Sequence, residues 1–301
     1  VGIYLKYLIE RGITCTWFNF KKKRILGYFK MRQRLIGMYY TECGELDAVV
    51  IGSDEVFALH TGPTPAFFGH ALPSKKVFAY GGCFGPTTID DIDYLHCRPF
   101  VTSGLKAMSG LGMRDQNSIS IVRELTGRKP VLTCDPVILY GYEKEMAKMT
   151  RPMEGKYMVL YAYDKRFNFP SEYEPVRAYA KMHNLRIVSP GFYQRWVEKN
   201  VNVDPIGLIN WFQYAECVVT DTFHGCVLSI ITGRAMAVRL RDNANKLQNL
   251  MQEYGLADRV IEENTDLEAL FCKAVDWQIV GAQIAERRKM SYDYLSRMIE
   301  Q

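Results

Sequence analysis

The most informative segment of the sequence is Cys217–Gly225, which reads CVVTDTFHG. An apolar run of strand length comes first, and a helix-like run from Cys226 to Ile231 follows. Thr222 stands where the N-cap of that helix belongs. A strand that passes directly into a helix is typical of α/β sheets, in which ligands bind beyond the carboxyl ends of the strands. We therefore expect this loop to bind a ligand.

The chemistry of the same loop favours an anion. The N–H groups of Phe223, His224 and Gly225 would point out of the sheet at the positive end of the helix. Gly225 would let a ligand approach the backbone closely, and His224 would supply a group that moves a proton. The alternative is a histidine that caps its own helix or bonds a neighbouring loop. For an isolated histidine we would prefer that alternative, but the rest of the chain favours a binding role.

Apolar runs of strand length recur along the chain and end in glycine or a polar residue. The predicted strands are 48–51, 77–80, 107–113, 131–133, 158–163, 185–189, 217–219 and 235–240, and the predicted helices are 116–126, 174–183, 226–231, 242–254 and 282–299. Strands that alternate with helices indicate parallel βαβ units. With a turn-rich segment at residues 151–155, the pattern predicts two similar α/β domains, 1–140 and 141–301.

The N-terminal region begins with a helix-like pattern at residues 2–10 that ends at Arg11-Gly12, and Ile13–Phe20 has the pattern of a strand. We expect a strand before the first helix in such a domain, and the pattern lacks it. A basic run, Lys21–Arg24, follows among aromatic and aliphatic residues. This run would suit peripheral association with a membrane surface, although a solvated helix face is the reading we favour.

Composition limits the classes of function. The chain has 301 residues and a net charge of +5, which suits anionic small molecules but is too mild to indicate nucleic acid. Its 8 cysteines form no C-x-x-C pair and show no zinc-ligand spacing, so we expect buried thiols, no metal and a cytoplasmic protein. No apolar run has the length of a spanning helix, and no secretory leader is visible.

Motifs of familiar nucleotide enzymes are absent from the sequence. Gly81–Gly85 is not G-x-G-x-x-G, and no glycine-rich loop ends in Gly-Lys-Ser/Thr. Ser53 lacks the G-x-S-x-G elbow of the serine hydrolases. The sequence therefore disfavours a dinucleotide site, a Walker-type ATP site and a hydrolytic serine.

Polar residues at predicted strand ends remain as the candidate site, namely Ser53, Asp54, Arg114 and Asp221–His224. Arg114 would hold a carboxylate or phosphate bidentately, or pair with a nearby acidic group. Asp54 and Asp221 would take part in the site, or serve only as N-caps. A helix terminus, an arginine and a histidine that converge on one cleft would suit a small phosphorylated acid.

At these positions the chain resembles the polysaccharide pyruvyl transferase family. The resemblance is carried by Val49–Phe57, Phe78–Gly85, Met113–Asp115, Asp135-Pro136 and Val218–Gly225, in matching order and spacing over about residues 1–260. It implies two Rossmann-like domains in a glycosyltransferase-B-like arrangement, with the active site in the interdomain cleft. It also implies phosphoenolpyruvate as donor, a hexose of a lipid-linked or polymeric cell-surface polysaccharide precursor as acceptor, a ketal product, and no cofactor.

The resemblance also assigns roles to residues. His224 would be the proton donor or phosphate contact, and Arg114 would hold the carboxylate or phosphate of the donor. Asp221, Thr222, Phe223 and Gly225 would line the donor site, whereas Gly52, Ser53 and Asp54 would bind the acceptor or shape the cleft. Two other hypotheses stay open: a nucleotide-sugar glycosyltransferase of the same architecture, and a truncated, inactive relative that acts as a binding subunit.

Overall fold

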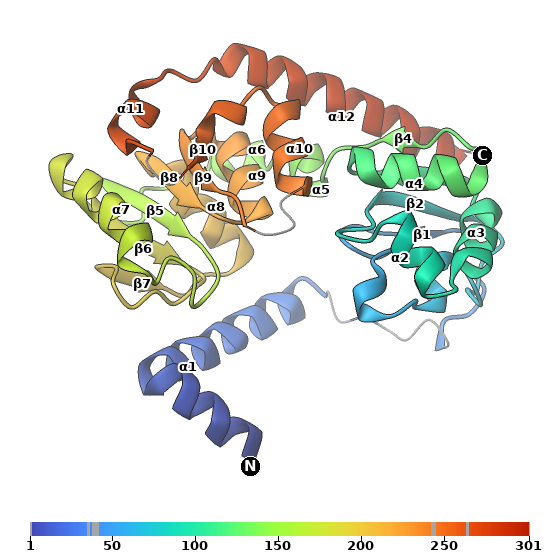
Figure 1. Cartoon of the computed structure of the whole chain (residues 1–301), viewed down its shortest axis with the longest axis horizontal. Coiled ribbons are helices and arrows are strands. Elements are labelled where there is room, and N and C mark those ends of the chain that lie inside the picture. Colours follow the sequence, from blue (N-terminus) through green and yellow to red (C-terminus); the bar gives the residue numbers. More distant parts are fainter. Residues whose placement is uncertain (1, 35–36, 38–41, 242–244, 263–264, 301) are drawn as a thin grey trace. The chain divides into compact units, whose positions relative to one another are not determined.

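The computed structural model describes residues 2–34, 37, 42–241, 245–262 and 265–300 (Figure 1). The chain forms two compact units. Unit 1 comprises residues 1–36, 142–242 and 255–277, and unit 2 comprises residues 37–141, 243–254 and 278–301. One change of unit falls after residue 141, one residue beyond the predicted boundary at 140. The division into 1–140 and 141–301 nevertheless differs from these units, because residues 1–36 belong to unit 1, and 243–254 and 278–301 to unit 2.

Unit 2 is built on a four-stranded parallel sheet in the order β1-β2-β3-β4. Its strands are β1 (Val49–Ile51), β2 (Val77–Gly82), β3 (Gly110–Met113) and β4 (Val131–Leu132). Its helices are α2 (Ile89–Tyr94), α3 (Arg98–Ala107), α4 (Gln116–Thr126), α5 (Pro136–Tyr140), α10 (Asn245–Glu253) and most of α12 (Trp277–Glu300), with short 3₁₀ turns at Leu59–Thr61 and Pro65–Phe68. The four strands are those that the apolar runs predicted.

The two faces of the unit 2 sheet are covered by different parts of the chain. Alternate residues of a strand point to opposite faces, so Val77 and Ala79 face one way and pack in one core cluster with residues of α2, α3 and α4. Phe78 and Tyr80 face the other way and pack against Tyr294 of α12. The Tyr294 hydroxyl donates to the carbonyl of Ala79 at 2.7 Å. The C-terminal helix is therefore an integral part of unit 2.

Unit 1 contains a six-stranded parallel sheet in the order β10-β9-β8-β5-β6-β7. Its strands are β5 (Tyr157–Tyr161), β6 (Arg186–Pro190), β7 (Lys199–Val201), β8 (Cys217–Thr220), β9 (Met236–Arg239) and β10 (Val260–Ile261). Its helices are α1 (Gly2–Arg32), α6 (Glu143–Met146), α7 (Pro170–Met182), α8 (Pro205–Gln213), α9 (Phe223–Thr232) and α11 (Leu267–Cys272), with a 3₁₀ turn at Ala257–Arg259. The strand order changes direction between β5 and β8, which places the switch point of the sheet there.

Helices cover both faces of this sheet as well. Met158, Leu160 and Val219 belong to a cluster that also contains residues of α7 and α11. On the opposite face, Tyr157 donates its hydroxyl hydrogen to a carbonyl of α8 at 2.9 Å, and the ring of Tyr161 packs edge-on against Phe212 of the same helix. Unit 1 is thus a three-layer α/β unit whose loops meet at the carboxyl edge of one parallel sheet.

Helix α1 corrects one prediction. The expected helix end at Arg11-Gly12 coincides with a kink, because Gly12 has φ 75°. The segment Ile13–Phe20, however, is helical and not a strand. Cys15 and Phe18 are its buried residues, three positions apart, which places them on one helix face against unit 1. The buried positions thus have a helical spacing rather than the alternation of a strand, while Ile13, Trp17 and Phe20 are exposed.

Candidate functional site

The β8–α9 loop has the capped geometry that its sequence predicted. Thr222 is the N-cap of α9, and its side-chain oxygen accepts a hydrogen bond from the N–H of Gly225 at 3.0 Å. Thr220 fixes the strand end, because its hydroxyl donates to the carbonyl of Tyr161 at 2.6 Å and accepts from the N–H of Thr222 at 3.1 Å. The loop is therefore held to the neighbouring strand β5.

Gly225 has a different role from the one expected. A Cβ atom at this position would lie 2.1 Å from the hydroxyl oxygen of Thr220 and 2.8 Å from that of Thr222. Its N–H already donates to Thr222. The glycine is thus required by the two threonine hydroxyls that build the loop, and the space beside it is filled by protein rather than left for a ligand.

Asp221 is the centre of an ion-pair network. Its side chain is fully buried, and Oδ2 accepts from Nε of Arg241 at 2.9 Å and from Nη1 of Arg166 at 3.4 Å. Arg241 also bonds Glu172, which in turn pairs with Arg239. Burial raises the pKa of Asp221, although the two arginines oppose this shift. Asp221 is therefore a buried anchor for two cationic side chains and is not an N-cap, a role that Thr222 fills.

His224 is the exposed side chain of this loop. It is the second residue of α9, whose neighbouring residues Phe223 and Gly225 are buried. The imidazole stands perpendicular to the Phe223 ring, with 5.5 Å between the ring centroids. The imidazole is exposed at the positive end of a helix, and two arginines are anchored to Asp221, three residues earlier. This arrangement is suited to an anion and to proton transfer.

Arg114, at the end of β3, is enclosed by acidic groups and a thiol. Its side chain is 4% exposed. Nη1 bonds Asp135 at 3.2 Å, and Nη2 bonds Asp54 at 2.9 Å and the sulfur of Cys83 at 3.1 Å. Burial raises the pKa of the Cys83 thiol, although Arg114 opposes it. This is the pairing that the sequence left as the alternative to a direct grip on a ligand.

The segment Gly52–Asp54 is set by close backbone contacts. A Cβ at Gly52 would lie 2.0 Å from the carbonyl oxygen of Tyr80, so no larger residue fits there. Asp54 has φ 74° and forms a parallel bridge with Gly82 of β2. Its side chain is 62% exposed, while Ser53 is half-buried. Arg114 thus holds a carboxylate that reaches the solvent.

The structure therefore gathers the predicted residues into two groups. Asp221, Thr222, Phe223, His224 and Gly225 lie together in unit 1, and Gly52, Ser53, Asp54 and Arg114 lie together in unit 2. Their convergence in one cleft stays a prediction. Within the ranges that the structure describes, no three His, Cys, Asp or Glu side chains gather in a way that could hold a metal ion.

Sequence reasoning missed Arg166 and Arg241. Arg241 comes directly after the predicted strand 235–240, and Arg166 lies in the loop after the predicted strand 158–163. Both therefore obey the strand-end rule that selected Arg114, and that rule would have found them. Asp135 was noted only as part of a motif, yet it is the N-cap of α5 and the buried partner of Arg114.

Solved structures with a similar fold are glycosyltransferases of the GT-B class. An α,α-trehalose 6-phosphate synthase from Burkholderia multivorans aligns with a TM-score of 0.50 at 9% identity, over 84% of this chain and 70% of that chain. OtsA in its apo form aligns with a TM-score of 0.48 at 10% identity, over 94% of this chain and 78% of that chain. The spinosyn forosaminyltransferase SpnP aligns with a TM-score of 0.40 at 12% identity, over 91% of this chain and 75% of that chain. The first likeness supports a GT-B-like α/β fold with two Rossmann-like units, and at such identity it concerns the fold alone.

The family follows from a separate comparison. The family model for polysaccharide pyruvyl transferases matches residues 4–240, and the chain belongs to this family. The matched range includes Gly52–Asp54, Arg114 and the β8–α9 loop. A search of curated proteins gave no match. No helix in the described part of the chain combines the length and hydropathy needed to cross a bilayer.

Proposed function

We propose that the protein transfers the pyruvyl group of phosphoenolpyruvate onto two hydroxyls of a hexose in a cell-surface polysaccharide precursor. The observation that carries this proposal is the β8–α9 loop of a pyruvyl transferase family member. In this loop a buried Asp221 anchors Arg166 and Arg241, and His224, three residues later, is exposed. Cationic side chains and a helix N-terminus are what a donor with a phosphate and a carboxylate needs.

His224, as imidazolium, would protonate the methylene carbon of the donor, which becomes the methyl group, while C2 gains positive character. One sugar hydroxyl attacks C2 and gives up its proton to a base. The C2–O bond to phosphate then breaks with its electron pair on phosphate, and the second hydroxyl attacks C2 to close the ketal. The protons balance over the reaction. One hydroxyl proton replaces the proton that His224 gave to the methyl group, and the other ends on hydrogen phosphate.

Asp54 is the residue of unit 2 that would take the hydroxyl proton. Its carboxylate is exposed, and Arg114 orients it from the buried side at 2.9 Å. A carboxylate held in this way accepts a hydrogen bond from a hydroxyl and draws off its proton as the oxygen attacks. In this proposal Arg114 positions Asp54, and the donor anion is held by the arginines of unit 1.

The test is phosphate release from phosphoenolpyruvate in the presence of a panel of lipid-linked and nitrophenyl hexosides. We expect release that depends on the acceptor, and a loss of about 10²- to 10⁴-fold in kcat for His224→Ala. Because His224 is exposed, its removal should change the unfolding free energy by no more than about 0.5 kcal/mol. His183→Ala is the matched control, because His183 is also in unit 1 but pairs with Glu268 away from the loop.

Two results would refute the proposal. One is release that is equally fast in His224→Ala and wild type. The other is the absence of both release and thermal stabilisation by phosphoenolpyruvate. Stabilisation by nucleoside diphosphates in place of phosphoenolpyruvate would instead indicate a glycosyltransferase.

A further inference from the structure

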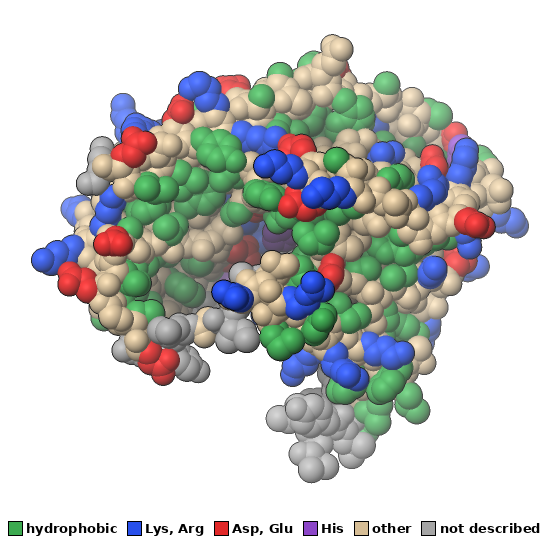
Figure 2. Space-filling model, turned by 180° about the vertical axis from the view of Figure 1, so that it is seen from behind, with side chains coloured by type: hydrophobic (Ala, Val, Ile, Leu, Met, Phe, Trp, Pro, Cys, Tyr) green, Lys and Arg blue, Asp and Glu red, His purple; other side chains and the backbone are tan. Residues whose placement is uncertain are grey.

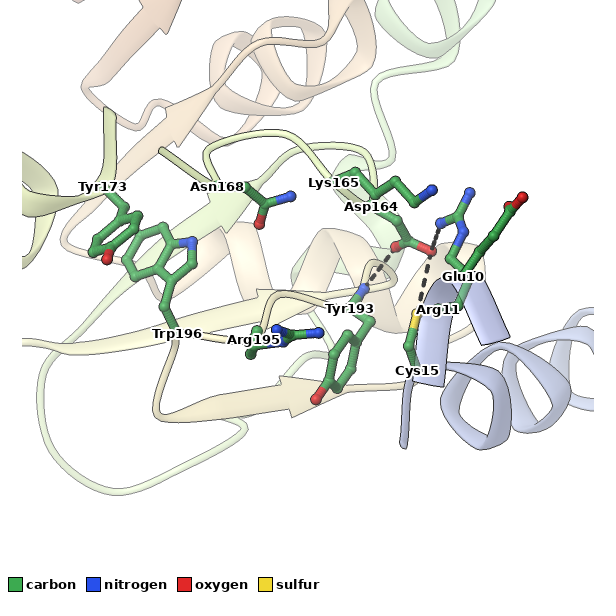
Figure 3. A pocket seen from close by; sticks show the side chains of 10 residues that line it. All are labelled: Glu10, Arg11, Cys15, Asp164, Lys165, Asn168, Tyr173, Tyr193, Arg195 and Trp196. Atoms are coloured by element: carbon green, nitrogen blue, oxygen red, sulfur yellow. Dashed lines mark hydrogen bonds and ion pairs between the residues drawn. The ribbon is translucent and has the colours of Figure 1, made fainter. Parts of the chain in front are cut away.

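A cavity of about 500 Å³ lies in unit 1 beyond the carboxyl ends of β5 and β6 (Figure 3). The loop after β5 supplies Asp164, Lys165 and Asn168, and the loop after β6 supplies Arg195 and Trp196. The first part of α1 closes one side. A volume of this size is in the range of small-molecule sites.

The two loops that form the cavity are cross-linked to each other. Oδ1 of Asp164 accepts the N–H of Tyr193 at 3.0 Å. The side-chain amide of Gln194 donates to the carbonyls of Ala162 and Tyr163 at 3.0 and 3.1 Å. The second oxygen of Asp164 is occupied by Arg11 at 2.8 Å. The walls are thus fixed before any ligand arrives, and the charge of Asp164 is compensated.

Three polar side chains of the cavity take no part in linking its loops. Lys165, Asn168 and Arg195 are exposed, and over the described residues their side chains make no hydrogen bond or ion pair. In Figure 3, Asn168 and Arg195 lie between the aromatic end of the cavity and the Asp164–Arg11 pair. Two unpaired cations would attract an anion, and the amide offers both a donor and an acceptor to a hydroxyl.

The other end of the cavity is aromatic. The rings of Tyr173 and Trp196 are stacked, with centroids 5.3 Å apart and planes 24° from parallel (Figure 3). Such rings present an apolar body and a polar edge. The C–H face of a sugar ring fits an apolar surface of this kind, while hydroxyls at its rim find the amide and the cations. A small anion such as free phosphate would leave the aromatic end unused.

We infer that this cavity binds an anionic hexose, a six-carbon sugar that carries a carboxylate or a phosphate. This inference rests on the proposed function in one respect, namely that the bound sugar is part of the acceptor. The loop after β5 connects the cavity with the donor loop, because Arg166 follows Lys165 and pairs with Asp221. The cavity would thus hold a charged sugar of the acceptor, and Lys165 and Arg195 would select acceptors that carry such a charge.

Isothermal titration of the full chain with glucuronic acid and with glucose 1-phosphate tests the inference, and the two arms separate carboxylate from phosphate. We expect saturable binding of at least one of them and about tenfold weaker binding in Arg195→Ala and in Lys165→Ala, since each removes one charge-assisted hydrogen bond. Arg177→Ala is the control, because Arg177 is an exposed arginine of α7 outside the cavity. This variant should bind like wild type.

Three results would overturn the inference. The first is no binding of either sugar at millimolar concentration. The second is binding that Arg195→Ala and Lys165→Ala leave unchanged or that glucose matches, which would remove the role of the charge. The third is binding of inorganic phosphate as tight as that of the sugars, which would remove the role of the aromatic end.

The donor is tested separately. Phosphoenolpyruvate should stabilise Arg195→Ala as much as wild type, and it should not displace the sugar. Displacement would make the cavity the donor site and overturn the acceptor assignment. If phosphoenolpyruvate has no effect on any variant while the sugars still bind, the proposed donor fails and the cavity stands.

Discussion

The two groups of site residues are charge-reversed versions of one arrangement. In unit 2 the arginine is buried and the carboxylate is outside, since Arg114 is 4% and Asp54 62% exposed. In unit 1 the carboxylate is buried and the arginines are outside, since Asp221 is 0% exposed while Arg166 and Arg241 are 40% and 26% exposed. Each group consists of a buried ion that holds an opposite charge at the surface.

Under the proposed function, the difference would prepare the two units for different substrates. A buried carboxylate that presents cations suits an anionic donor, whereas a buried cation that presents a carboxylate suits a hydroxyl that must lose a proton. We therefore expect the buried member of each pair to govern stability and the exposed member to be available for chemistry. Substitutions of the two members should therefore separate these properties.

The largest effect on stability is expected for Arg114→Ala. This change removes the ion pair of Arg114 with Asp135, whose side chain is 1% exposed. Removing one member of a buried pair costs about 3–5 kcal/mol, which urea unfolding of both proteins will measure. A loss below about 1 kcal/mol in unfolding free energy, which is the range of surface ion pairs, would contradict the view that buried Arg114 governs the stability of its group. Loss of activity in this variant is thus no evidence that Arg114 contacts the donor.

Arg241→Ala should have an intermediate effect. Asp221 keeps Arg166 and Glu172 keeps Arg239, so each buried acid retains one cation. We expect a loss of about 1–3 kcal/mol in unfolding free energy, the value of hydrogen bonds to charged groups. Thermal stabilisation by phosphoenolpyruvate should fall as well. Unchanged stabilisation, equal to that of the control Arg177→Ala, would contradict a donor role for the exposed cations.

Asp54→Ala should change stability least among the three side-chain removals. Its ion pair is solvent-exposed on the carboxylate side, and such pairs contribute up to about 1 kcal/mol. Turnover that depends on the acceptor should nevertheless drop, while stabilisation by phosphoenolpyruvate stays at the wild-type level. The comparison would fail if this variant lost donor binding and kept its turnover.

The pH dependence of stability tests the buried carboxylate of unit 1. Burial raises the pKa of Asp221 above its ordinary value of 3.8. The folded state then keeps a proton that the unfolded state has lost, so this group lowers stability as pH rises from 3.8 through the folded pKa. Asp221→Asn lacks this titration. In urea titrations, the unfolding free energy of the wild type relative to that of the variant should decline as pH rises above 3.8. A rise would show that the two arginines lower the pKa of Asp221 more than burial raises it.

Much of the fold could be predicted because parallel strands buried on both faces are continuous apolar runs. β1, β2, β5 and β8 follow from such runs. β7 was missed because Lys199-Asn200-Val201 contains no apolar run, and β10 because its two apolar residues are flanked by charged ones. α8 was missed because Ile209, Trp211 and Phe212 look like an irregular apolar stretch. The assignment of α1 and α12 to their units depends on contacts between distant segments, which no local pattern records.

The sequence predicted which residues belong to the candidate site better than it predicted what each of them contacts. A strand-end rule finds Arg114 and His224, but it cannot tell that Asp135 fills the inner side of Arg114. Glycine in a loop does not reveal whether ligand or protein lies beside it, and at Gly225 it is protein. The cavity of Lys165 and Arg195 comes from two loops without periodicity, brought together by Asp164 and Gln194.

The position of α12 also sets an order of events during synthesis. Phe78 and Tyr80 lie on a sheet face that Tyr294 covers, about 200 residues later in the chain. At a translation rate of roughly 5–20 residues per second, the ribosome needs on the order of 10–40 s to deliver that cover. Until then this aromatic face is open to chaperones and to other nascent chains. Unit 2 begins its sheet early and is completed only after all of unit 1, which ends at residue 277, has been made.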